Sequence, residues 1–119
     1  MGSNVDDLLQ IIKKRSDKLQ FASGFIKEAA REKRVPDKCC EDALELVIKI
    51  DSFLNEDIYN IKALLENYKQ ILLGEKKQTS PPITEDDVGH AYGYSMYQID
   101  LLQSKAKNME ELVLPRYIL

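Results

Sequence analysis

Apolar or small side chains recur every three or four residues along the last third of the chain, in a 4-3-4-3 order. This spacing gives a helix one apolar face along its whole length, and we call such a face a seam. It is typical of helices that pack lengthwise against other helices, and it predicts a helix over about residues 84–114. Its seam positions are Val88, Tyr92, Ser95, Ile99, Leu102, Ala106, Met109 and Val113.

The beginning of this helix carries several local signals. Thr84 is a good N-cap, and Asp87, three residues later, can complete a capping box with it. Ile83 and Val88 stand on either side of the cap in the positions of a hydrophobic staple. Pro115 cannot continue the helix, so we expect it to end near residue 114.

The same spacing predicts two earlier helices, over about residues 4–34 and 37–73. Asn4 is a suitable N-cap for the first helix, and Pro36 disfavours helical geometry just after its end. Gly74 is a natural left-handed C-cap for the second helix, and Pro81 and Pro82 make residues 74–83 a linker. The first seam runs through Val5, Leu9, Ile12, Ser16, Leu19, Ser23, Ile26 and Ala30, and the second through Ala43, Val47, Ile50, Leu54, Ile58, Ile61, Leu65, Tyr68 and Leu72.

The second seam contains one irregular step, because Leu54 and Ile58 are four residues apart where three would continue the pattern. A single long helix that drifts at about 3.6 residues per turn would produce such a step, and so would a turn with Asn55 as a new N-cap. The sequence favours the unbroken helix. We therefore expect an all-α fold: an up-down-up bundle of three long antiparallel helices in one domain over residues 1–119, or four shorter helices if the second one breaks near Asn55.

Composition is consistent with a single globular domain. The chain has 119 residues, of which 44% are hydrophobic and 31% charged, and no apolar run exceeds three residues, so no transmembrane helix is expected. Its two cysteines, Cys39 and Cys40, are adjacent and point about 100° apart on a helix, which does not suit a disulfide between them. We expect free thiols and an intracellular, reducing location such as the cytoplasm.

Charge is unevenly distributed. The net charge of −3 argues against a general nucleic-acid binder, yet residues 1–34 hold eight basic and five acidic side chains, while the later helices are acidic. Ion pairs between the helices would explain this pattern, and so would a partner-binding surface. For the second explanation the expected contact residues are Lys14, Lys18, Lys27, Arg31 and Arg34, together with Tyr94, which leaves the third seam and could be an exposed aromatic anchor.

Candidate catalytic chemistry is sparse. His90, the one histidine, could serve a phosphotransfer bundle, although it lacks the neighbouring Lys-Gly pair that such domains usually carry. Asp87 and His90 are too few to hold a metal ion, and acidic neighbours oppose activation of Cys39 or Cys40. We expect no catalytic residue, no metal and no cofactor.

The sequence therefore predicts a non-enzymatic protein–protein interaction module, a small helical adaptor or complex subunit that binds a partner helix or peptide, or that self-associates. Two alternatives remain open. One is a histidine phosphotransfer-like signalling bundle that uses His90. The other is a protein that binds an anionic membrane surface or a nucleic acid through its basic first helix.

Overall fold

The structure, a computed structural model, describes residues 2–116, and every regular element within them is helical. The molecule is long and narrow, with principal extents of 58 × 23 × 18 Å. The elements are α1 (Gly2–Arg31), a 3₁₀ turn η1 (Asp37–Cys39), α2 (Cys40–Ser52), a π-helical turn η2 (Phe53–Ile58), α3 (Tyr59–Leu72) and α4 (Glu85–Glu110).

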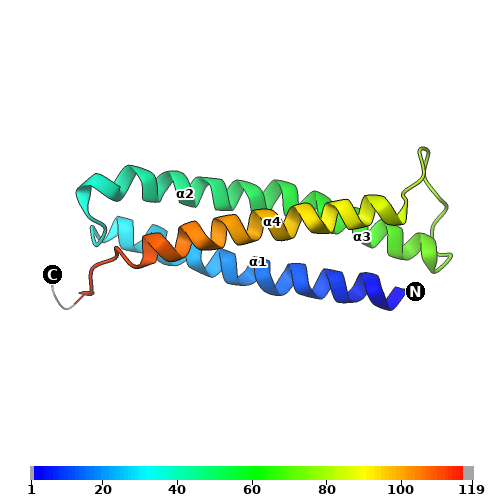
Figure 1. Cartoon of the computed structure of the whole chain (residues 1–119), viewed down its shortest axis with the longest axis horizontal. Coiled ribbons are helices and arrows are strands. Elements are labelled where there is room, and N and C mark those ends of the chain that lie inside the picture. Colours follow the sequence, from blue (N-terminus) through cyan, green and yellow to red (C-terminus); the bar gives the residue numbers. More distant parts are fainter. Residues whose placement is uncertain (1, 117–119) are drawn as a thin grey trace.

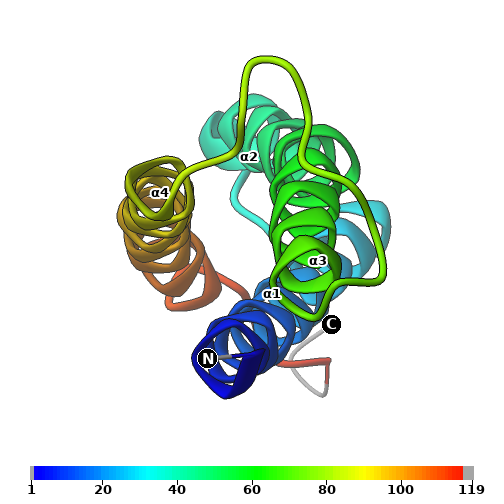
Figure 2. The same cartoon turned by 90° about the vertical axis from the view of Figure 1, so that its right-hand side faces the viewer.

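These elements form three rods that lie side by side (Figure 1). α2, η2 and α3 follow one another without a break and make up a single rod. Seen from the end, α1, α4 and the α2–α3 rod occupy the corners of a triangle (Figure 2). α1 packs closely against both other rods, whereas α2 and α3 meet α4 more sparsely. The prediction of an all-helical bundle with three long helices is confirmed at this level.

The irregular step of the second seam is explained by η2. In a π turn each backbone N–H bonds to the carbonyl five residues earlier, so one extra residue fits into the turn without a change of direction. Leu54 and Ile58 both belong to this turn, and both pack in or against the core. The alternative of a break at Asn55 is therefore wrong, and the unbroken helix absorbs its extra residue in η2 rather than by gradual drift.

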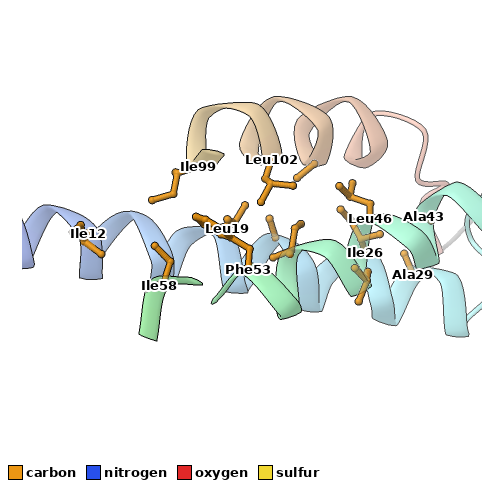
Figure 3. Packing of buried hydrophobic residues seen from close by; sticks show 14 of the residues in the cluster. Ile12, Leu19, Ile26, Ala29, Ala43, Leu46, Phe53, Ile58, Ile99 and Leu102 are labelled. Carbon is orange, nitrogen blue, oxygen red and sulfur yellow. The ribbon is translucent and has the colours of Figure 1, made fainter. Parts of the chain in front are cut away.

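The three seams converge on one core. Ile12, Leu19 and Ile26 of α1 belong to the same buried cluster as Ile99 and Leu102 of α4 and Phe53 and Ile58 of the second rod (Figure 3). Each fully buried aliphatic side chain of this kind contributes about 1.5–3 kcal/mol relative to an exposed one, so these residues dominate the stability of the bundle. Leu72, predicted to be in the second seam, is 38% exposed because it lies in the last turn of α3.

Both ends of the first helix differ from expectation. α1 already includes Gly2, so Asn4 lies inside the helix and is not its N-cap. At the other end, α1 stops at Arg31 rather than Arg34 because Lys33 takes a left-handed conformation with φ +58°. The N–H of Lys33 donates to the Ala30 carbonyl at 3.1 Å and that of Arg34 to the Ala29 carbonyl at 2.8 Å. This pair of bonds is a Schellman motif, and it closes the helix without a glycine.

The second rod ends in the same motif with the expected residue. Gly74 has φ +75°, its N–H donates to the Ile71 carbonyl at 3.1 Å, and the N–H of Glu75 donates to the Gln70 carbonyl at 2.8 Å. The prediction of Gly74 as a left-handed cap is thus confirmed.

The predicted capping box of α4 is also present. Thr84 Oγ1 accepts from the Asp87 N–H at 3.2 Å, and Asp87 Oδ2 accepts from the Thr84 N–H at 2.9 Å. The end of α4 was predicted too late. The helix stops at Glu110 because the N–H of Leu114 donates to the Arg34 carbonyl at 2.7 Å, which directs the chain towards the loop after α1.

Candidate functional site

A row of three shallow hollows follows the boundary where the α2–α3 rod faces α4, and no described residue of α1 lines any of them. Their volumes are about 320, 380 and 410 Å³, and neighbouring hollows share lining residues. We call this row the groove. Its apolar lining is Leu46, Ile48, Phe53 and Ile61 on one wall and Ala91, Leu101, Leu102, Met109 and Leu112 on the other, with Tyr94 above.

Large apolar side chains along the groove are open to solvent. Tyr94 and Leu101 of α4 are 47% and 40% exposed, and Leu112, in the turn just after α4, is 44% exposed. Ile48 on the opposite wall is 66% exposed. Tyr94 and Leu101 are seven residues apart, so they share one face of α4. Leu112 follows the end of α4 and lines the same groove. An exposed apolar line of this length on a small protein is typical of an interaction surface.

This second apolar face of α4 is not part of the seam predicted from the sequence. Its signal is the spacing of Tyr94 and Leu101, which are about two helical turns apart. The spacing alone does not predict whether another helix of the bundle buries this face. That depends on the distance between the α2–α3 rod and α4.

Tyr94 reaches across one end of the groove. Its Oη donates to Asp57 Oδ2 at 2.9 Å, which links α4 to the π turn η2. This hydrogen bond raises the pKa of Tyr94 above its usual value, and partial burial and the negative charge of Asp57 act in the same direction. Tyr94 is exposed, as the sequence suggested, but its hydroxyl is held in place rather than free.

The charges of the groove are ordered along its length. Lys49 and Lys105 project from opposite walls and both line the same two hollows, while Asp42 and Glu45 lie at one end and Asp57 towards the other. Within residues 2–116 neither lysine makes an ion pair. The groove therefore combines an apolar lining with a basic middle and acidic flanks.

The basic residues predicted to bind a partner do not form one surface. Lys14, Lys18, Lys27 and Arg31 are exposed. Lys14 and Lys18 follow each other on one face of α1, but Lys27 lies about 140° from Lys14 and about 180° from Lys18 around the helix, with Arg31 beside it. Arg31 pairs with Glu28 of its own helix at 2.6 Å, which raises the pKa of the arginine.

Arg34 is not part of any exposed basic surface. It is only 5% exposed and donates through Nη1 to the Leu114 carbonyl at 3.1 Å, so its role in the structure is to hold the segment after α4. Other α1 residues make ion pairs with the other two rods, which is one of the two explanations proposed for the uneven distribution of charge. Arg15 pairs with Asp100 of α4, and Asp6 pairs with Lys69 of α3 at 2.7 Å.

The candidate reactive residues lie apart from one another. His90 is exposed at the end of the groove near Asp57 and Tyr94. Cys39 and Cys40 are free thiols, partly buried against the core where η1 meets α2. Within the described part of the chain, no three His, Cys, Asp or Glu side chains are grouped so that they could hold a metal ion.

A separate polar hollow of about 290 Å³ lies between α1 and η2. Ser23 Oγ donates to Asp51 Oδ1 at 2.9 Å next to it, and Ser16, which lines it, has a buried hydroxyl with no hydrogen-bond partner among residues 2–116. A buried hydroxyl of this kind is destabilising unless water reaches it. The polar lining of this hollow distinguishes it from the groove.

None of the described helices is both long enough and apolar enough to cross a bilayer. Comparisons with protein-family models, with curated proteins and with solved structures found no match for this chain. The groove is thus the feature of the molecule on which a functional proposal can be based.

Proposed function

We propose that this protein is a non-enzymatic helix-docking module: an up-down-up three-helix bundle that receives an amphipathic helix of a partner protein in the groove between α2–α3 and α4. The observation that carries the proposal is the line of exposed apolar side chains, Ile48, Leu101, Leu112 and Tyr94, along the walls of three adjoining hollows. Burying such a line is the main source of affinity in helix-in-groove recognition.

The arrangement of the rods supports a helix as the occupant. Three rods at the corners of a triangle leave one side, between α2–α3 and α4, where the contact is sparse (Figure 2). A fourth helix laid over that side would convert the triangle into a four-helix arrangement, in which every helix packs against two neighbours at about 8–10 Å. The groove runs parallel to α4, which is about 39 Å long at 1.5 Å per residue, so several turns of a partner helix fit along it.

The residues that line the groove indicate which side chains a partner helix would carry. Apolar residues at helical spacing would fill the hollows at Phe53 and Leu101, and polar residues on the partner's flanks would meet the charged groove residues. Lys49 and Lys105 in the middle favour an acidic residue at that level of the partner helix, because neither lysine has an ion-pair partner among residues 2–116. We also propose an intracellular location, which the two free thiols support.

The test is affinity purification from a native extract with the wild type, with Leu101→Asp and with Ile48→Asp. Both side chains are exposed, so the variants should keep the helical circular dichroism and melting behaviour of the wild type. Phe21→Asp is the matched control, because Phe21 is 79% exposed on α1, outside the groove.

The proposal expects one protein to co-purify in stoichiometric amount with the wild type and with Phe21→Asp, and to be lost with both groove variants. Retention of the same proteins by all four baits would show that the groove is not the docking surface.

A further inference from the structure

We infer that the groove is filled, in the absence of another partner, by α4 of a second copy of this chain, laid antiparallel to the first α4. This inference rests on the proposed function, since it names an occupant for the same groove.

Asp87, in the first turn of α4, and Lys105 lie on the exposed face of this helix. They are 18 residues apart, which is five helical turns, so both lie on the same face at a separation of about 27 Å. Tyr94 and Leu101, the exposed apolar residues, lie between them on that face. The face is therefore acidic at its beginning, apolar in its middle and basic towards its end.

Such a face is complementary to itself under a two-fold axis. Two copies of α4 can run antiparallel with Asp87 of the first opposite Lys105 of the second. The two-fold symmetry then also places Lys105 of the first copy opposite Asp87 of the second. In this register Tyr94 lies opposite Gln98 of the second copy and Leu101 lies opposite Ala91. The apolar residues thus meet small or amphipathic ones near the axis, and no like charges on this face stand opposite each other.

The opposite wall of the groove reinforces this register. Lys49 of α2 lines the same two hollows as Lys105, so both ammonium groups lie at the level that the first turn of the second α4 would reach. That turn carries Glu85, Asp86 and Asp87. A parallel arrangement would instead bring the lysines of one copy close to those of the other, which repulsion disfavours.

The measurement is sedimentation velocity of the whole chain from low micromolar to millimolar concentration. The inference expects a monomer–dimer equilibrium in the micromolar range, because a contact along one helix buries a small interface. It also expects the dimer to weaken as salt rises from about 0.05 to about 0.5 M, since exposed ion pairs are screened.

Charge reversal tests the register itself. Lys105→Glu should weaken the dimer about tenfold or more, because both symmetric ion pairs become repulsive. Asp87→Lys should do the same, and an equimolar mixture of the two variants should recover the wild-type affinity as a heterodimer. Asp87→Asn is the control for the capping box, since its amide oxygen can still accept from the Thr84 N–H. Lys14→Glu on α1 should leave the dimer unchanged.

Two results would overturn the inference. The first is a wild type that stays monomeric at every concentration. The second is a dimer that Lys105→Glu does not weaken, or that the mixture of reversed variants fails to restore. If the wild type is monomeric and Leu101→Asp still loses a co-purifying protein, the groove remains a docking surface for that protein and only the second copy is excluded.

Discussion

Arg34 and Leu114 hold each other through two hydrogen bonds in opposite directions. The Leu114 N–H donates to the Arg34 carbonyl at 2.7 Å, and the Arg34 guanidinium donates to the Leu114 carbonyl at 3.1 Å. Eighty residues separate the pair in the sequence. The contact fastens the chain after α4 to the loop after α1, and so it fixes one end of the rod that forms a wall of the groove.

Replacing Arg34 should therefore destabilise the bundle. Arg34→Met keeps most of the side-chain volume but removes the bond to Leu114 and the pairing with Glu32, and it should lower the free energy of unfolding by about 1.5–3 kcal/mol, the range for hydrogen bonds from charged groups. Urea denaturation measures this change. Arg31→Met is the matched control, because its pair with Glu28 is exposed to solvent and screened, so its loss should change the free energy of unfolding much less. Equal losses for the two variants would contradict the role given to Arg34.

Acid should loosen the same end of the molecule through Glu32. Arg116, followed by Arg34, hydrogen-bonds the Glu32 carboxylate and lowers its pKa below the ordinary value of 4.5. A carboxyl with a lowered pKa in the folded state stabilises the fold above its unfolded pKa, and this stabilisation disappears as the pH falls through the folded value. Thermal melts between about pH 6 and pH 2 should show a smaller drop for Glu32→Gln than for the wild type. Parallel pH profiles for the two proteins would show that Glu32 does not contribute in this way.

The two Schellman motifs give a reciprocal pair of substitutions. Lys33 adopts φ +58° where glycine is favoured, so Lys33→Gly should stabilise the protein by about 0.5–1 kcal/mol. Gly74 adopts φ +75° with open space around it, so Gly74→Ala should destabilise by about 1 kcal/mol through backbone strain alone. Chemical denaturation of both variants tests this, and changes of the same sign at the two sites would refute it.

A deletion tests the π turn. Removal of the exposed Asn55 should convert η2 into a regular helical turn, in which Leu54 and Ile58 return to the three-residue step of the seam. We expect the variant to fold and to lose less than about 1.5 kcal/mol. Deletion of Lys62, which is also exposed, should rotate the rest of α3 by about 100° and take Leu65 out of the core. Urea denaturation of both deletion variants measures the difference. Equal stability of the two variants would contradict this prediction, and so would failure of the Asn55 deletion to fold.

The seams could be predicted because their signal is local. A buried position such as Ile99 or Leu19 follows from the spacing of its neighbours on one helix, and the capping box of Thr84 and Asp87 is spelled out within four residues. The irregular step at Leu54 is visible in the sequence as well, but the π turn that accommodates it is not. Local spacing cannot choose between a drift, a break and an inserted residue, because all three shift the seam by the same amount.

The groove and the end of α1 could not be predicted for a different reason. Leu101 is on an exposed face only because the α2–α3 rod stands away from α4, and that separation depends on packing between residues far apart in the sequence. In the sequence, Arg34 cannot be distinguished from the other basic residues around it. Its burial follows from a contact with Leu114, which is far away in the sequence and leaves no local pattern. The left-handed backbone at residue 33 could not be predicted either, because the residue there is a lysine and not a glycine.

Site-specific photo-crosslinking tests the groove most directly. A benzophenone side chain placed at Leu101 would lie in the central hollow, and the same group at Phe21 would lie on exposed α1 as the control. We predict that irradiation in native extract joins the Leu101 derivative to one defined polypeptide, either a partner or a second copy, through a helical segment with apolar residues at three- and four-residue spacing. The Phe21 derivative should give no such product. Crosslinks from Phe21 alone, or none from Leu101 while the bundle remains folded, would contradict the claim that this groove is where another helix binds.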